Sequence, residues 1–205
     1  KHRARSGFQV AMTSLQTTLR PVRRHLLRPL SARSSSLAHL LPTPLEPSVR
    51  THLVFGANTD VGKTVLSAGL LRAASPARAR YVKPLQTGGP TVDADFVGTY
   101  CPAAECHTLY SWDAPVSPHL ASRGEECPVA ASEILRGTNA LLAVAPPCSW
   151  TLVETAGGVL SPGPVDGSGA WRPQADVLAP LHLPAVLAGD SRMGGISATL
   201  CALEA

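Results

Sequence analysis

Residues 52–64, HLVFGANTDVGKT, join a short apolar run to a glycine-rich loop that ends in Gly-Lys-Thr. The apolar run indicates a buried strand, and Lys63-Thr64 opens a helical stretch that extends to residue 74. A glycine-rich loop between a strand and a helix is where phosphate binds, because glycine lets the backbone approach phosphate oxygens and the helix N-terminus attracts anions. Five residues separate Gly56 from Gly62, one more than in the usual P-loop spacing.

This loop supplies the residues that a nucleotide site requires. Lys63 is expected to offset charge on the β- and γ-phosphates, and the hydroxyl of Thr64 is expected to bind Mg²⁺. The alternative is a glycine turn that binds no nucleotide. The expected ATP-binding residues are Gly56, Asp60, Val61, Gly62, Lys63, Thr64 and Val65.

Downstream of the loop, apolar runs alternate with helical stretches. We expect strands at residues 52–56, 80–84, 150–154 and 185–190, and helices at 63–74, 93–100, 128–145, 175–182 and from 195 onward. Pro84 is expected to close the second strand, and Pro102, Pro115 and Pro118 favour a loop. Apolar strands that alternate with helices indicate an α/β fold, with a mostly parallel sheet that helices cover on both faces.

Four polar residues are candidates for the chemistry at the strand ends. P-loop enzymes commonly hold their metal ion with an acid after a neighbouring strand, and Glu154 and Asp190 both fit that position. Asp95, in the segment DADF, is a third acid, although an Asp near a helix start also serves as a cap. Lys83 ends a strand, so its ammonium is expected either in the ligand crevice at the carboxyl ends of the strands or in a rim salt bridge.

The small residues of ETAGG, residues 154–158, permit a ligand to approach the end of another strand closely. The five cysteines contain no C-x-x-C pair, and their odd number argues for free thiols. Cys101, Cys106 and His107 lack the fourth ligand and the spacing of a zinc site.

Charge divides the chain into a basic leader and an acidic remainder. Residues 1–50 hold nine Lys and Arg and one acid, whereas residues 51–205 hold nine basic and thirteen acidic residues, so the net charge of +4 combines +8 with −4. The Arg-rich, Ser-rich and acid-poor leader is typical of an organellar transit peptide, with a basic arm that touches nucleic acid as the alternative. We expect a transit peptide and Pro-rich spacer at 1–48 and a P-loop domain at 49–205.

The leader's arginine content favours the mitochondrion over the plastid as the destination. No apolar run approaches the roughly 18 residues that span a bilayer. We therefore expect the mature protein to act on small molecules, without a nucleic-acid partner or a membrane.

Six segments, in this order, resemble the dethiobiotin synthetase family, and its plant form in particular. They are GANTDVGKT, YVKPLQTG, DADFV, APVSPH, LVETAGGVLSPGP and GDSRMGGIS, and they cover about residues 51–200. The longer P-loop belongs to the same pattern. The resemblance implies an ATP-dependent ligase of biotin biosynthesis, which closes a ureido ring on 7,8-diaminononanoate with CO₂ through a carbamate and a carbamic–phosphoric anhydride.

The resemblance also implies roles for single residues. Lys83 matches the lysine that contacts the carbamate and the γ-phosphate, and it joins Lys63 and Thr59 as the implied catalytic residues. The implied Mg²⁺ ligands are Thr64, Asp95 and Glu154. The implied substrate-binding residues are Thr59, Lys83, Thr87, Gly157, Gly194, Gly195, Ile196 and Ser197.

The last four of these residues begin a helix that would hold the substrate's distal carboxylate across a homodimer interface. In plants such a synthetase is fused to a diaminopelargonic acid aminotransferase behind a mitochondrial leader. The family's adenine-recognition segment lies beyond Ala205, so the resemblance implies a domain that is incomplete at its C-terminus. Asp60 stands where relatives often carry Glu, and Thr155 stands where bacterial relatives have Gly.

Two alternatives to an active synthetase stay open. One is a P-loop switch protein of the partitioning type, although such proteins carry a Lys directly after the first loop glycine, where this chain has Ala57. The other is an inactive, truncated product of the same gene.

Overall fold

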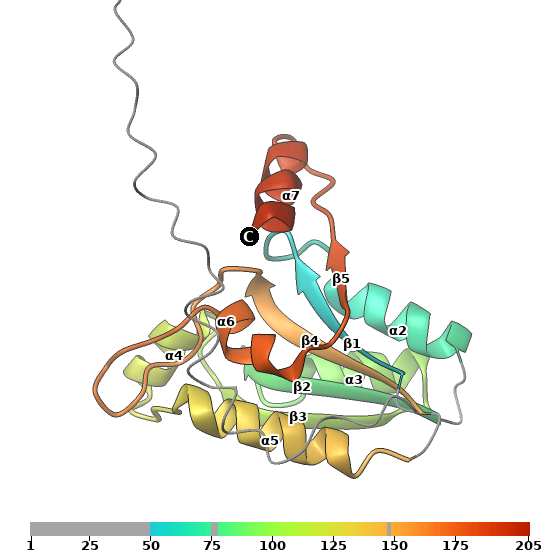
Figure 1. Ribbon diagram of the computed structural model, residues 1–205, viewed down its shortest axis with the longest axis horizontal. Coiled ribbons are helices and arrows are strands. Elements are labelled where there is room, and N and C mark those ends of the chain that lie inside the picture. The colour runs from blue at the N-terminus through green and yellow to red at the C-terminus, as the bar shows by residue number, and fades with distance from the viewer. Residues whose placement is uncertain (1–49, 75–77, 147–148) are drawn as a thin grey trace, which may run out of the picture.

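The computed structural model describes residues 50–74, 78–146 and 149–205. The expected transit peptide and spacer at 1–48 lie outside the described residues. No helix among the described residues is long and apolar enough to cross a bilayer. The elements follow one another as β1 (Arg50–Gly56), α2 (Lys63–Ala74), β2 (Ala79–Thr87), α3 (Val92–Tyr100), β3 (Glu105–Trp112), α4 (Pro118–Gly124), α5 (Ala131–Ala143), β4 (Trp150–Gly158), α6 (Gln174–Leu178), a 3₁₀ helix (Ala179–Leu181), β5 (Ala185–Ala188) and α7 (Gly195–Glu204) (Figure 1).

The strands form one sheet in the order β3-β2-β4-β1-β5, and every neighbouring pair is parallel. This arrangement confirms the predicted α/β class. Because all strands run the same way, their carboxyl ends meet at one edge of the sheet, where ligands bind in open α/β folds. The loop after β1 reaches that edge between β4 and β5.

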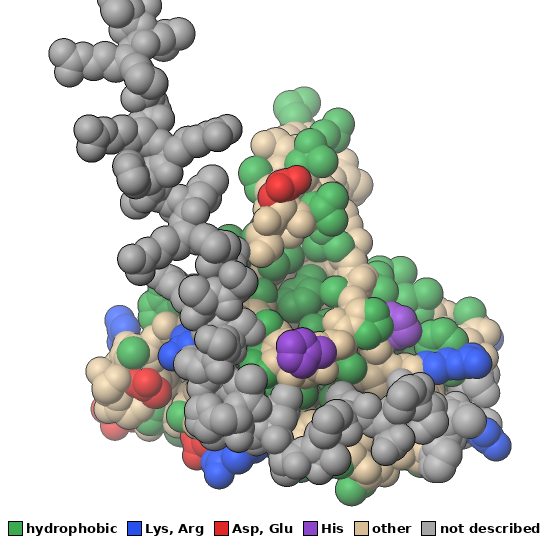
Figure 2. Space-filling model, viewed as in Figure 1, with side chains coloured by type: hydrophobic (Ala, Val, Ile, Leu, Met, Phe, Trp, Pro, Cys, Tyr) green, Lys and Arg blue, Asp and Glu red, His purple; other side chains and the backbone are tan. Residues whose placement is uncertain are grey.

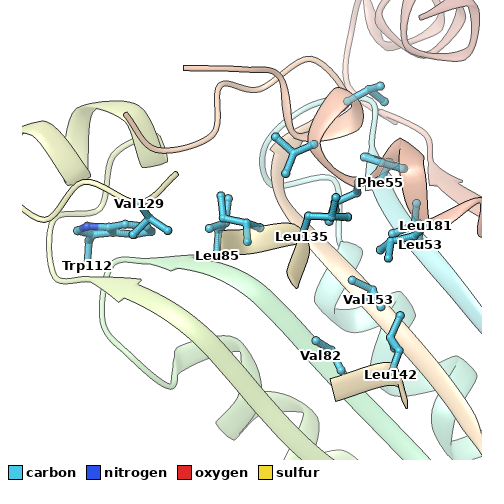
Figure 3. Packing of buried hydrophobic residues seen from close by; sticks show 14 of the residues in the cluster. Leu53, Phe55, Val82, Leu85, Trp112, Val129, Leu135, Leu142, Val153 and Leu181 are labelled. Carbon is cyan, nitrogen blue, oxygen red and sulfur yellow. The ribbon is translucent and has the colours of Figure 1, made fainter. Parts of the chain in front are cut away.

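Helices cover both faces of the sheet, as α5 and α6 lie on one side and α2 and α3 on the other (Figure 1). Successive β1 side chains alternate between the two layers. Leu53 and Phe55 join the cluster that contains Leu135 of α5, which Figure 3 shows from close by. Val54 joins the cluster that contains Leu71 of α2. The core therefore holds β1, which leads into the phosphate loop, between two packed layers.

The structure differs from the sequence predictions in the region after α3. Residues 105–112 form β3 and residues 118–124 form α4, although the prolines had favoured a loop throughout. β3 is an edge strand with mostly half-buried residues, so it lacks the apolar run of the central strands. Pro118 occupies the first turn of α4, where the missing N–H costs nothing.

Three strands, β1, β2 and β4, are longer than predicted, whereas β5 ends two residues earlier than predicted. β2 continues past Pro84 to Thr87, and its pairing with β3 includes Lys83 and Leu85 but passes over the proline. A proline is tolerated in a strand where its nitrogen makes no ladder hydrogen bond. β4 extends to Gly158, which carries the small residues of ETAGG to the sheet edge.

Helix α7 stands beyond the end of β5, apart from the layers that cover the sheet (Figure 1). Gly195 is its buried residue, whereas Ile196, Leu200 and Leu203 are exposed. Figure 2 shows hydrophobic side chains along much of this projecting helix. Helix α7 therefore presents an apolar surface that the rest of the described chain does not cover.

Candidate active site

A cavity of about 510 Å³ opens at the carboxyl ends of β2 and β4, beside the N-terminus of α2. Its walls combine the phosphate loop (residues 56–64), two strand ends and the first turn of α3. The lining residues are Thr59, Asp60, Gly62, Lys63, Thr64, Val65, Lys83, Gln86, Thr87, Val92, Asp93, Phe96, Glu154, Ala156 and Gly157.

The backbone of the phosphate loop explains its glycines. A Cβ on Gly56 would lie 2.7 Å from the carbonyl oxygen of Asn58 and 3.0 Å from Nζ of Lys63, so a larger residue would displace the loop. Asp60 and Gly62 have φ angles of 56° and 86°, in the left-handed region. These two residues turn the loop into α2, whose helical hydrogen bonds begin with Leu66 N–H donating to Gly62 at 2.9 Å.

Glu154 is the centre of the polar groups under this loop. Its side chain has 0% exposure, and it accepts hydrogen bonds from the hydroxyls of Thr64 at 2.9 Å and Ser67 at 2.7 Å. The ammonium of Lys83 lies 2.9 Å from the same Oε1 that Thr64 contacts, and 2.6 Å from Oδ2 of Asp93. Lys83 therefore lies in the middle of β2 and not at its end, and its ammonium is a buried cation between two carboxylates that line the cavity.

A second cation lies in the same pocket. Lys63 is 7% exposed, and its burial lowers the pKa of its ammonium. The charge of Lys83 lowers this pKa further, whereas Glu154 and Asp93 act in the opposite direction. Two lysines therefore share one pocket. A bound anion, such as a phosphate, would stabilise the charged form of their side chains.

The cavity brings together most of the residues predicted from the sequence. Gly56 and Val61 do not line it, and they lie against each other, since a Cβ on Gly56 would come within 2.9 Å of the Val61 side chain. The predicted residues at the cavity are Thr59, Asp60, Gly62, Lys63, Thr64, Val65, Lys83, Thr87, Glu154 and Gly157.

The two acids of DADF occupy different places. Asp93 lines the cavity beside Lys83, whereas Asp95 is exposed and accepts a hydrogen bond from the hydroxyl of Thr91 at 2.7 Å. Asp93 precedes the buried Val97 by four residues, so the two share the inward face of α3. That spacing was the available sequence signal for Asp93. The structure places Asp93 at the site, and not the predicted Asp95.

The predicted carboxylate-binding residues lie elsewhere. Gly194, Gly195, Ile196 and Ser197 line a separate cavity of about 740 Å³ at the start of α7. Asp190 lines that cavity too and pairs with Arg192 at 2.9 Å. The hydrogen bonds from Arg192 lower the pKa of Asp190 to about 2. Of the two acids, Glu154 is therefore the one that lines the cavity of Lys63 and Lys83.

The oxygen donors around Glu154 fit a magnesium ion. Mg²⁺ binds through one or two carboxylates together with substrate phosphates, and Thr64, Asp93 and Glu154 offer a hydroxyl and two carboxylates at one cavity. Protein groups alone do not form a closed metal cage, since the described residues contain no group of three or more His, Cys, Asp or Glu placed to hold an ion. The cysteines in the described part of the chain, Cys101, Cys106, Cys127 and Cys201, are free thiols.

Comparisons with known proteins identify a matching family and several similar proteins. The family described as an AAA domain matches residues 50–205. The bifunctional dethiobiotin synthetase/adenosylmethionine-8-amino-7-oxononanoate aminotransferase of Emericella nidulans is 41% identical, over 77% of this chain and 20% of that protein. The mitochondrial bifunctional dethiobiotin synthetase/7,8-diamino-pelargonic acid aminotransferase of Oryza sativa subsp. japonica is 37% identical, over 74% of this chain and 25% of that protein.

The chain covers a larger share of a third, shorter relative. The ATP-dependent dethiobiotin synthetase of Paramagnetospirillum magneticum is 36% identical, over 76% of this chain and 69% of that protein. The chain thus spans a quarter or less of the two bifunctional relatives, and about two thirds of the bacterial one.

Proposed function

Because this chain belongs to the dethiobiotin synthetase family, we propose that it closes the ureido ring of dethiobiotin from 7,8-diaminononanoate, CO₂ and ATP. One amine of the substrate captures CO₂ as a carbamate and loses a proton, and a carbamate oxygen then attacks the γ-phosphate of ATP and releases ADP. The second amine attacks the resulting carbamic–phosphoric anhydride, and phosphate leaves as the ring closes. The observation that carries this proposal is the shared cavity of Lys63 and Lys83.

The reaction requires two anions, a carbamate and a triphosphate, to meet in one place. Lys63 lies at the N-terminus of α2, where the phosphates are proposed to bind, and Lys83 lies on β2 and lines the same cavity. Both ammonium groups would offset the charge that brings the anions together. Thr59, which lines the same cavity, is proposed to contact the reacting nitrogens, and Thr87 and Gly157 to contact the rest of the substrate.

We propose that Thr64, Glu154 and Asp93 hold Mg²⁺, with Asp93 in the place that the sequence resemblance gave to Asp95. The ion would neutralise charge on the β- and γ-phosphates. Asp93→Asn and Asp95→Asn form a matched pair for this assignment, because the two acids lie two residues apart on α3. We expect Asp93→Asn to raise the Mg²⁺ concentration needed for half-maximal nucleotide binding and Asp95→Asn to leave it unchanged. The reverse order would restore Asp95 as the ligand.

The carboxylate of the substrate is proposed to bind at the start of α7, where Gly194–Ser197 line the second cavity. Helix N-termini favour anions. A homodimer would complete this site, and sedimentation of the purified protein tests that arrangement. A monomer with full activity would contradict it.

The bifunctional relatives suggest the cellular setting. Two of them carry an aminotransferase in the same protein, and the rice protein is named as mitochondrial. We propose that this chain likewise functions in the mitochondrion, beside an aminotransferase that supplies its diamine. Import of the leader fused to a fluorescent protein tests the location.

The decisive experiment incubates the purified protein with 7,8-diaminononanoate, labelled bicarbonate and MgATP, and detects dethiobiotin by mass spectrometry. We expect labelled product in the wild type and none in Lys63→Met, which lacks the proposed phosphate-binding ammonium. ATP hydrolysis without product would favour a nucleotide switch of the partitioning type. Nucleotide binding without either reaction would favour an inactive product.

A further inference from the structure

Arg192 connects the segment after β5 to the phosphate loop. Its Nη2 donates a hydrogen bond to the backbone carbonyl of Thr59 at 2.9 Å, across 133 positions of sequence. The same guanidinium donates two hydrogen bonds to the carboxylate of Asp190, from Nε to Oδ1 at 2.9 Å and from Nη2 to Oδ2 at 3.0 Å. One side chain therefore holds both a neighbouring acid and a backbone atom of the loop.

Asn58 extends this connection from the loop side. Its amide Nδ2 donates a hydrogen bond to Oδ2 of Asp190 at 3.3 Å, and its Oδ1 accepts a hydrogen bond from the backbone N–H of Thr59 at 2.8 Å. The Asp190 side chain is 6% exposed beneath these groups. Asp190 therefore orients the guanidinium of Arg192 through hydrogen bonds. Arg192 and Asn58 both contact the backbone of Thr59.

Arg192 and Asn58 contact a part of the phosphate loop, Thr59 and Asp60, that the protein core does not cover. Thr59 and Asp60 are exposed, and Asp60 has a left-handed φ of 56°. These two residues also line the cavity that contains Lys63 and Lys83. Any shift of the Thr59 carbonyl would move groups at the cavity wall, and displacements of about 1 Å in such groups cost roughly 100-fold in rate.

We propose that Arg192 is a positioning residue, which holds the Thr59–Asp60 stretch of the phosphate loop in its binding geometry through the Thr59 carbonyl. The proposal rests on the proposed function in one respect, that the loop binds a nucleotide. Arginine suits this task because its planar fork serves two acceptors at once, whereas a lysine ammonium acts as a point charge.

The test compares Arg192→Met and Arg192→Lys with Arg136→Met, a matched control that removes an exposed arginine on α5. Binding of a non-hydrolysable ATP analogue with Mg²⁺ is measured by calorimetry, and kcat and KM for ATP are measured where product forms. We expect both Arg192 variants to bind the analogue at least about tenfold more weakly, with Arg136→Met equal to the wild type. A merely structural role would lower the melting temperature without changing the affinity below it.

Equal affinity and equal turnover in Arg192→Met and Arg136→Met would overturn the proposal. If Arg192→Met does not fold, Asp190→Asn removes the anchoring charge with little change in shape and is expected to weaken binding in the same way. An unchanged affinity in that variant would likewise overturn it. A wild type that binds the analogue but forms no dethiobiotin would contradict the proposed function and leave this test intact.

Discussion

The ammonium of Lys83 lies 2.9 Å from a carboxylate oxygen of Glu154, and the two side chains are 4% and 0% exposed. A buried pair of this kind is costly to break, because removing one partner leaves the other charge without compensation. Lys83→Met should therefore abolish turnover and also lower the free energy of unfolding by about 3–5 kcal/mol, measured by urea denaturation. Asp93, which is 24% exposed, remains close enough to water to be solvated in the variant.

The double variant Lys83→Met/Glu154→Gln separates these two effects. Because both charges are absent, we expect it to recover part of the lost stability and none of the activity. A loss below about 1 kcal/mol in the single variant would show that the ion pair contributes as little as an exposed one.

Ser67 provides a second test of the environment of Glu154. Its hydroxyl donates to Oε2 at 2.7 Å, and Ser67 itself is fully buried. Ser67→Ala should cost about 1.5–3 kcal/mol in unfolding free energy, because a buried carboxylate loses one of its donors. Ser132→Ala, on the half-buried side of α5, is the control and should change stability by less than about 0.5 kcal/mol. Equal effects at the two positions would contradict a special role for the Ser67 bond.

The parts of the fold with a strong local pattern could be predicted from the sequence. Residues 52–64 combine an apolar run, glycines and Gly-Lys-Thr within thirteen positions, so neighbouring residues alone determine β1 and the loop. β3 could not be predicted in the same way, because an edge strand with half-buried polar residues lacks an apolar signal.

The candidate site likewise contains residues that local sequence patterns predict and residues that they do not predict. Lys63 and Lys83 both belong to strong local patterns, since Lys63 begins α2 and Lys83 lies in β2 directly before Pro84. Asp95 stays a prediction as a metal ligand, whereas Asp93 lines the cavity, because the helix register, which the motif alone does not contain, decides which acid faces inward. The contact of Arg192 with Thr59 joins residues 133 positions apart, and such pairs leave no mark on local sequence patterns.

The turn at Gly157 gives a prediction about backbone strain. Its φ is +73°, and an added Cβ would collide with the side chain of Ser161, whose hydroxyl accepts the Gly158 N–H at 2.7 Å. Gly157→Ala should therefore destabilise the fold by about 1–3 kcal/mol in urea denaturation and weaken substrate binding at the adjacent cavity wall. Gly167→Ala is the control, because an added Cβ there has no neighbour within 4 Å. Equal stability of the two variants would contradict the strain at Gly157.

The lowered pKa of Lys63 predicts how stability depends on pH. Burial and the charge of Lys83 bring the pKa of Lys63 in the folded protein below its ordinary value of 10.5. Between the folded and the ordinary pKa, the unfolded chain binds a proton that the folded protein does not bind, so stability rises with pH across that window.

Lys63→Met removes this contribution and provides the reference. The difference in unfolding free energy between the wild type and Lys63→Met should therefore shift in favour of the wild type as the pH rises toward 10.5. In the same window, a bound triphosphate restores the charge of Lys63, because an adjacent anion favours the ammonium. Nucleotide binding should then take up protons, which calorimetry in two buffers of different ionisation enthalpy measures. Binding without proton uptake, together with a stability difference that does not change with pH, would place Lys63 away from the phosphates.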